Sequence, residues 1–409
     1  MQASHFRKRT LPLVLVMTGI AGIIYATRMN APMTNNLIAP NIKPVDAAAD
    51  SLDKQSIQVV FALDATGSMG GLIAAAKEKI WSIASSLSQT KEGIPIEMGL
   101  VFYRDLGDDF VTRQIPLSGS LDDVYRELMS IDANGGGDSP ESVNQGLWEA
   151  VDQMKWASGN KAFKAIFLVG DQPPHMDYKQ DVKYNISCKK AHERGIVINT
   201  ILMGGDGQAR TIWKEIADCA QGSFFQMDMD VNNVEISTPY DPQISKLSDE
   251  IEQGRMYYGD METIKKQSAK VEKSVYISSN ASDEVKSRRA EYNMSASGNS
   301  AFYGEKELIQ DYSKGKVDLA KLKDIELPHQ LLKMTLAERK AFLDQAVTKR
   351  KAQEQELKQL AVQRQAYLEK EMAKMDDDKV KSSFNNQVFE SVQKQAAEKE
   401  IRIEGKAKY

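Results

Sequence analysis

Residues 57–69, with the sequence IQVVFALDATGSM, constrain the fold of this chain more than any other stretch. Their first half is a short, almost unbroken apolar run, which is typical of a parallel strand covered by helices on both faces. The run stops at Asp64, and Thr66 and Ser68 follow at alternate positions. An extended or turning loop can point these three oxygens the same way, and such hard donors suit Mg²⁺, Mn²⁺ or Ca²⁺. A simpler interpretation is that Ser68 only caps the helix that opens near Gly70, but capping needs just one of the three residues.

Short apolar runs alternate with helical patterns along the next part of the chain. Apolar residues at helical spacing follow the first loop in residues 72–87. Further apolar runs that predict strands lie at residues 94–103, 165–169 and 196–203. Such alternation is the signature of an α/β, doubly wound sheet. We therefore predict one α/β domain over residues 57–234, followed by a mainly helical C-terminal region.

The beginning of the chain predicts export. Basic residues at positions 7–9 precede residues 11–26, which carry no charge. This pattern indicates that residues 1–26 are a signal peptide or a membrane anchor. Because basic residues stay on the cytoplasmic side, we expect the rest of the chain in the periplasm, on the periplasmic face of the inner membrane or at the cell surface. An uncleaved segment would hold the protein at the membrane.

Composition and missing motifs argue against several function classes. The net charge of −4 gives no basic footprint for nucleic acid. The four histidines do not pair at zinc spacing, and no GxxxxGK[ST] phosphate loop occurs. We therefore expect a binding protein and not an enzyme.

Three further regions follow from composition and spacing. Residues 27–56 are poor in large apolar side chains and predict a linker. Residues 235–318 are rich in polar and charged side chains, which predicts a partly ordered connector. Residues 319–409 predict a helical tail. Within it, leucines near heptad spacing at 334–375 leave a coiled coil open, but charged seam positions favour a helical hairpin.

The chain has two cysteines, Cys188 and Cys219, and both lie in the part expected to be exported. In an oxidising compartment they can form a disulfide. Two separately buried thiols are an equally good interpretation, because the sequence does not give their separation.

Three predicted loops carry oxygen donors. The first holds Asp64, Thr66 and Ser68; the second is GGGDSPE at residues 135–141; and Asp171 directly follows the strand-like run AIFLVG. Loops beyond the carboxyl ends of strands in an open α/β sheet meet at one crevice. We therefore expect these loops to form one site.

The ordered patterns DATGSM, GGGDSPE and IFLVGD resemble the metal-ion-dependent adhesion site of von Willebrand factor type A domains. The resemblance implies a six-stranded, mostly parallel sheet with a divalent cation at its top, Mg²⁺ first, with Ca²⁺ or Mn²⁺ as alternatives. It implies that Thr66 and Ser68 bind the cation through their hydroxyls. It also implies that Asp64 and Asp171 act directly or through water.

The second loop is similar to that of integrin β subunits, whose glutamate joins the metal shell, which makes Glu141 a candidate ligand. A related similarity, VFYRD ending in Asp105, implies a second cation site formed by Asp105, Asp138, Glu141 and the carbonyl of Pro140. The asparagine expected two positions before Asp138 is absent, because that position holds a glycine.

The function that the resemblance implies is binding of a protein ligand. A cation held by neutral hydroxyls and few carboxylates stays electrophilic, so an acidic side chain of the partner can complete its shell. We expect a role in adhesion or envelope assembly, and residues 313–343 are similar to a segment of some exported bacterial proteins. The alternatives are an accessory subunit of an AAA+ ATPase or chelatase-like machine, and a structural protein that acts through its helical tail.

Overall fold

The structure of the protein is a computed structural model that describes residues 55–409 except 91–92, 138, 228–235 and 376–379. The predicted signal peptide or anchor and residues 27–54 of the predicted linker lie outside the described residues. In the described part of the chain, no helix is both long enough and apolar enough to cross a membrane.

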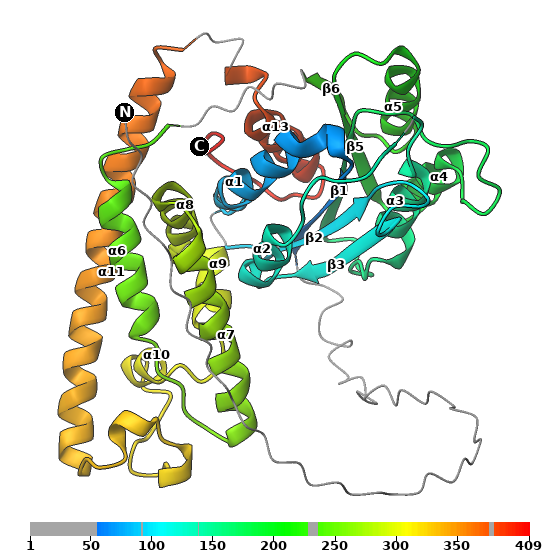
Figure 1. Cartoon of the computed structure of the whole chain (residues 1–409). Helices are drawn as coiled ribbons and strands as arrows, with labels where there is room; N and C mark the ends of the chain where they lie inside the picture. The colour runs from blue at the N-terminus through cyan, green and yellow to red at the C-terminus, as the bar shows by residue number, and fades with distance from the viewer. Residues whose placement is uncertain (1–54, 91–92, 138, 228–235, 376–379) are drawn as a thin grey trace, which may run out of the picture. The chain divides into compact units, whose positions relative to one another are not determined.

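A six-stranded sheet forms the centre of the described chain, with the strand order β3-β2-β1-β4-β5-β6 (Figure 1). All neighbouring strands are parallel except β3, which pairs antiparallel with β2 at one edge. The strands are β1 (Ser56–Asp64), β2 (Ile96–Tyr103), β3 (Thr112–Ser118), β4 (Ala162–Gly170), β5 (Ile196–Met203) and β6 (Phe224–Met227). The central strands β1 and β4 are almost wholly buried, as their apolar sequences predicted. The α/β, doubly wound fold is therefore confirmed.

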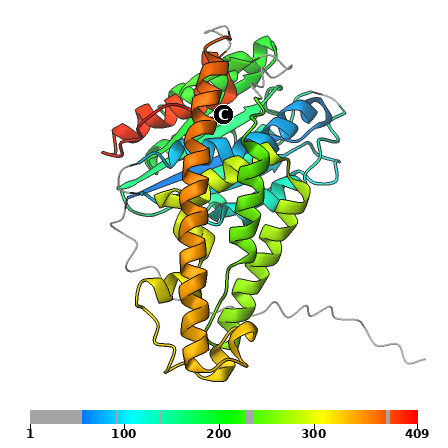
Figure 2. The same ribbon diagram turned by 90° about the vertical axis from the view of Figure 1, so that its left-hand side faces the viewer.

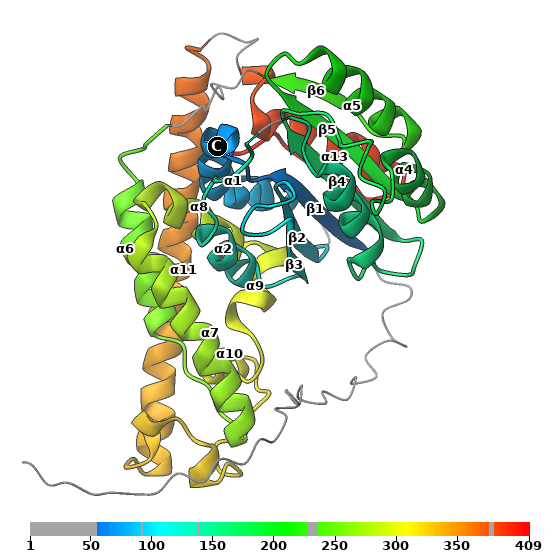
Figure 3. The same cartoon turned by 45° about the vertical axis from the view of Figure 1, so that its right-hand side comes forward.

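Helices cover both faces of the sheet (Figure 3). One face packs against α1 (Gly70–Leu87), α2 (Leu121–Met129) and α13 (Phe384–Ala397). The other face packs against α3 (Val143–Trp148), η2 (Glu149–Gln153), α4 (Tyr184–Glu193) and α5 (Gly207–Cys219). Because side chains of a strand alternate between faces, Phe61 joins the first apolar cluster and Val60 the second.

The C-terminal residues return to the sheet and complete the domain. The ring of Phe384 in α13 lies 6.4 Å from that of Phe61 in β1. Gln395 exchanges side-chain hydrogen bonds of 3.1 and 2.7 Å with the buried Asn199 of β5. The domain predicted over residues 57–234 does not include α13, which supplies part of the apolar cover of one sheet face.

Residues 236–375 form a helical insertion between β6 and α13, and the prediction of a partly ordered connector at 235–318 was wrong. The insertion contains α6 (Asp241–Gln253), α7 (Met261–Asn280), α8 (Asp283–Met294), α9 (Ala296–Tyr303), α10 (Leu308–Ser313), η3 (Asp324–Glu326), η4 (His329–Leu331) and α11 (Leu336–Met372). The long helix α11 lies beside α6 (Figure 2). Ile244 and Ile251 of α6 share an apolar cluster with Leu357 and Leu360 of α11.

Buried arginines explain why the composition of the insertion was misleading. Arg289 of α8 donates to both carboxylate oxygens of Asp122 in α2 at 2.7 Å and also pairs with Glu252 of α6. Arg364, one of the charged positions that argued against a coiled coil, is buried in α11 and pairs with Asp241 at 2.7 Å. Side chains that a composition count assigns to solvent are here part of the packed interior. Arg289 joins the insertion to the sheet domain, and Arg364 joins α11 to α6 within the insertion.

Candidate metal centre

The three predicted loops meet at the carboxyl ends of β1 and β4. These strands are neighbours, so Asp64 at the end of β1 lies close to Asp171, which follows β4. Gly170 permits this approach, because a Cβ atom there would lie 3.1 Å from Asp64 Oδ2 and 2.3 Å from the hydroxyl of Tyr103. That hydroxyl donates to the carbonyl of Val169 at 3.0 Å. A glycine is thus required where the two carboxylate-bearing ends come together.

The first loop is organised around one oxygen of Asp64. The backbone N–H and the hydroxyl of Thr66 donate to Asp64 Oδ1 at 2.9 and 2.7 Å. The hydroxyls of Thr66 and Ser68 lie 3.2 Å apart. Neither side chain caps α1, because its N-cap is Met69 and no side chain accepts there. The capping interpretation of Ser68 therefore has no support, and the three side chains are grouped as the spacing predicted.

The second loop brings Glu141 to the first. Gly135 and Gly136 both have positive φ angles, and the Gly135 carbonyl accepts from the N–H of Gly67 at 3.0 Å. A Cβ atom on Gly136 would lie 2.8 Å from the Thr66 side chain and 2.9 Å from Glu141 Oε1. Glu141 and Thr66 therefore approach each other across this glycine.

The third loop is held to the second by backbone hydrogen bonds. The N–H of Glu141 donates to the carbonyl of Pro173 at 3.1 Å, and that of His175 donates to the carbonyl of Glu141 at 3.1 Å. The loop after β4 and the loop before α3 are thus fixed to each other beside the site.

The site buries three carboxyl groups, and no basic side chain of the described residues forms an ion pair with Asp64, Glu141 or Asp171. Burial raises the pKa of Asp64 to about 7, with the neighbouring Asp171 adding to the effect of burial against hydrogen bonds from Thr66. Burial, and then the nearby carboxylates led by Asp64, raise the pKa of Glu141 to about 9. Asp64 Oδ2, Glu141 Oε2 and Asp171 Oδ1 are buried and accept no hydrogen bond from the residues that the structure describes. Such orphaned oxygens are costly unless a further group meets them.

The donor set fits a divalent cation. Carboxylate and hydroxyl oxygens are the ligands that Mg²⁺ and Ca²⁺ prefer. Among the residues that the structure describes, no three His, Cys, Asp or Glu side chains are grouped closely enough to hold a metal by themselves. The hydroxyls of Thr66 and Ser68 would therefore have to supply part of the shell. Ser68 is exposed while Asp64 and Thr66 are buried, so the site opens to the surface on the Ser68 side.

Asp105, one residue of the predicted second cation site, accepts two side-chain hydrogen bonds. Ser142 donates to Asp105 Oδ1 at 2.9 Å and Tyr178 donates to Oδ2 at 2.9 Å. The ring of Tyr178 stacks on His175 with centroids 3.8 Å apart. Pro140 and Glu141 are described, whereas Asp138 lies outside the described residues. Ser142 and Tyr178 were not among the predicted site residues, and only the position of Ser142 next to Glu141 could have indicated one of them.

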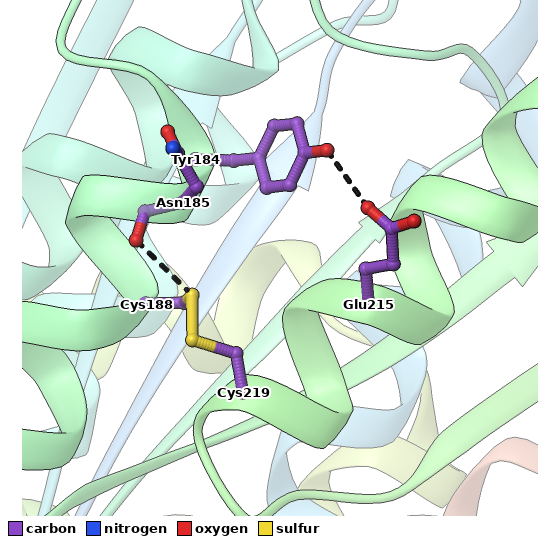
Figure 4. The surroundings of a disulfide bond; sticks show 5 residues. All are labelled: Tyr184, Asn185, Cys188, Glu215 and Cys219. Carbon is purple, nitrogen blue, oxygen red and sulfur yellow. Dashed lines mark hydrogen bonds between the residues drawn. A yellow bond between two sulfur atoms is a disulfide. The ribbon is translucent and has the colours of Figure 1, made fainter.

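Cys188 and Cys219 form a disulfide between α4 and α5 (Figure 4). Their Cα atoms are 5.9 Å apart. Beside it, the Tyr184 hydroxyl donates to Glu215 at 2.8 Å, which joins the same two helices. The disulfide therefore braces the helices on one face of the sheet.

Comparisons with known proteins match the sheet domain. Residues 58–226 match the family model described as von Willebrand factor A domain. A putative ariadne-like RING finger protein of Acanthamoeba polyphaga mimivirus is 26% identical over 33% of this chain and 13% of that protein. An alpha-protein kinase of Dictyostelium discoideum is 27% identical over 30% of this chain and 19% of that protein. The chain thus spans less than a fifth of either relative. Among solved structures, the SpRpn10 VWA domain matches 43% of this chain and 88% of its own, at 13% identity and a TM-score of 0.33.

Proposed function

This chain contains a von Willebrand factor A domain, which indicates a protein-interaction or adhesion-type function, and we propose that it binds its partner through a divalent cation. The ligands in this proposal are Asp64, Thr66, Ser68, Glu141 and Asp171. The observation that carries it is the set of three buried carboxylate oxygens that find no hydrogen-bond donor among the described residues. A divalent cation is a group that can satisfy all three.

In this proposal the cation is Mg²⁺, with Ca²⁺ or Mn²⁺ as alternatives, and a partner carboxylate completes its shell. The exposed side of Ser68 is where such a carboxylate could enter. The protein then acts by binding and not by catalysis. A partner without an acidic side chain at the contact would bind weakly, because a neutral group cannot replace a carboxylate on the cation.

The proposed location is outside the cytoplasm. The disulfide between Cys188 and Cys219 supports this, because disulfides persist in oxidising compartments and are rare in the cytosol. An exported domain cannot meet a cytoplasmic AAA+ ATPase, so the disulfide favours adhesion or envelope assembly over a role as an accessory subunit.

Calorimetric titration of the purified protein with Mg²⁺ and Ca²⁺ tests the cation. We expect saturable binding by the wild type and none by Asp64→Ala. Asp132→Ala is the matched control, because its carboxylate is 91% exposed and lies outside the ligand set. Wild-type affinity in Asp64→Ala, or no binding by the wild type, would contradict the proposal. A stoichiometry of two cations, reduced to one by Asp138→Ala, would support the second site.

Crosslinking in intact cells tests the partner. We expect the wild type to capture an acidic-surfaced envelope protein, and both a chelator and Asp64→Ala to abolish capture. Capture that survives both treatments would mean that another surface, such as the helical insertion, binds the partner.

A further inference from the structure

A cavity of about 490 Å³ lies at the amino ends of β4 and β5, at the opposite end of the sheet from the metal loops. It is bordered by the first residues of β4 and by the turn from α4 into β5. Its lining includes Lys164, His192, Arg194 and Lys399, and Glu193 is the one acidic residue among the described residues that line it. The metal loops follow the carboxyl ends of the same strands, so the two sites are separated by the length of β4.

Lys164 gives this cavity a buried positive charge. The residue is 8% exposed and belongs to the sheet. Its ammonium donates to the carbonyl of Arg194 at 2.7 Å and to that of Ala157 at 3.3 Å. An ammonium group has three N–H donors, so one remains for a further acceptor. Within the described residues, no carboxylate forms an ion pair with it.

The other cations increase the positive charge around Lys164. Burial lowers the pKa of Lys164, and the charges of Arg194 and Lys399 lower it further. Arg194 is partly engaged, since it donates to the carbonyl of Val151 at 2.6 Å and lies 3.6 Å from Asp152. Lys399 is exposed, and its side chain has no ion-pair partner in the described part of the chain. A buried, uncompensated cation next to an unengaged one is stabilised by a bound anion.

We propose that this cavity binds the oxyanion of a small molecule, a phosphate or carboxylate group, between Lys164 and Lys399. The Ser158 hydroxyl and the Asn160 amide also line the cavity and can donate to the anion. The volume is far larger than the roughly 30 Å³ that one water occupies, so an organic remainder also fits. Lys399 belongs to the segment after α13, so a bound anion would join the returning C-terminal segment to the sheet.

Thermal unfolding of the purified protein in metal-free buffer at pH 7.4 tests this proposal independently of the cation site. Inorganic phosphate and acetate are the probes, and sodium chloride at the same ionic strength is the reference. We expect phosphate, or acetate at higher concentration, to raise the melting temperature of the wild type in a saturable manner. A larger effect of phosphate would identify the ligand as a phosphorylated molecule, and a larger effect of acetate as a carboxylate.

Variants assign the effect to the cavity. Lys399→Gln should weaken anion binding by at least about tenfold, the cost of losing one charge-assisted hydrogen bond, and Lys399→Arg should restore it. Lys164→Met should abolish it. Lys155→Gln is the matched control, because Lys155 is exposed and does not line the cavity. Lys164 is buried and Lys399 is exposed, so the Lys399 variants decide the test if Lys164→Met does not fold.

Two results would overturn the proposal. In one, phosphate and acetate raise the melting temperature no more than chloride, which would mean that Lys164 only caps the carboxyl end of α4. In the other, Lys399→Gln and Lys155→Gln respond as the wild type does, which would place the anion elsewhere.

Discussion

Buried carboxylates occur both at the metal loops and at the junction between the sheet and the helical insertion, and the two regions differ in what faces the charge. At the metal loops, burial raises the pKa of Asp64 to about 7, and among the described residues no side chain donates to its second oxygen. At the junction, burial acts on Asp122 in the same direction, but the charge and hydrogen bonds of Arg289 outweigh it and lower the pKa of Asp122. Burial alone therefore does not decide the charge state of a carboxylate in this protein.

This difference indicates that the junction, which we call a joint, is a structural contact, whereas the metal loops are a binding site. The junction supplies its own cation, so its carboxylates stabilise the contact of α2, α6 and α8 at all times. The metal loops leave the cation to be supplied from solution, so their stability should depend on what is bound. A substitution at the junction should therefore lower the stability of the fold and leave cation affinity unchanged. A substitution at the metal loops should lower cation affinity without lowering stability.

Arg289→Met should have the largest effect. It leaves the buried Asp122 and Glu252 without their cation, and breaking a buried pair from one side costs roughly 3–5 kcal/mol. Urea unfolding would measure this loss in the free energy of unfolding, and cation affinity of the folded protein should not change. The control is Lys273→Ala, which removes a partly exposed pair with Asp123 and should cost less than about 1 kcal/mol. Equal costs for the two variants would contradict the comparison.

Removal of the disulfide should have the next largest effect on the free energy of unfolding. The half-cystines are 31 residues apart in the sequence, and loop-closure entropy gives about 3–4 kcal/mol for a loop of that length. Chemical unfolding of the Cys188→Ser/Cys219→Ser double variant would measure it. Because neither cysteine contacts the metal loops, its cation affinity should equal that of the wild type. A parallel loss of cation affinity would show that stability and binding cannot be separated in this domain.

Asp64→Asn should have the opposite effects to those expected for Arg289→Met: a loss of cation affinity without a loss of stability. We expect cation affinity to fall by at least about 100-fold, since even changes behind the ligands cost roughly 10- to 100-fold. In chelator, the free energy of unfolding should be unchanged or higher, because a buried charge without a counter-charge is removed. Calorimetry and urea unfolding give the two values, with Asp132→Asn as the exposed control. A loss of stability as large as that of Arg289→Met would mean that Asp64 is a structural residue.

The sheet and the first loop could be predicted because their signals are local. The apolar run of β1 and the alternating Asp64, Thr66 and Ser68 lie within a few residues of each other. The return of α13 could not be predicted, because an amphipathic helix does not specify which apolar surface it covers. Tyr178, which is 73 residues from Asp105 in the sequence, was missed for the same reason. The burial of Arg289 and Arg364 could not be predicted, because their acidic partners come from distant helices.

The pH dependence of stability should differ in sign between Asp64 at the metal loops and Asp122 at the junction. In chelator, the contribution of Asp64 is fully present below its ordinary pKa of 3.8 and is lost as the pH rises through the raised value of about 7. The contribution of Asp122 is present above 3.8 and is lost as the pH falls through its lowered pKa. Urea unfolding at a series of pH values, compared with Asp64→Asn and Asp122→Asn, isolates each contribution.

Relative to Asp64→Asn, the wild type in chelator should lose stability as the pH rises from about 4 to about 8. Saturating Mg²⁺ should remove this slope, because a bound cation keeps the carboxylate ionised at little cost. Relative to Asp122→Asn, the wild type should lose stability only below about pH 4, with or without Mg²⁺. If both differences had the same sign, or if Mg²⁺ changed neither, the metal loops would have a positive partner of their own and the distinction between joint and binding site would fail.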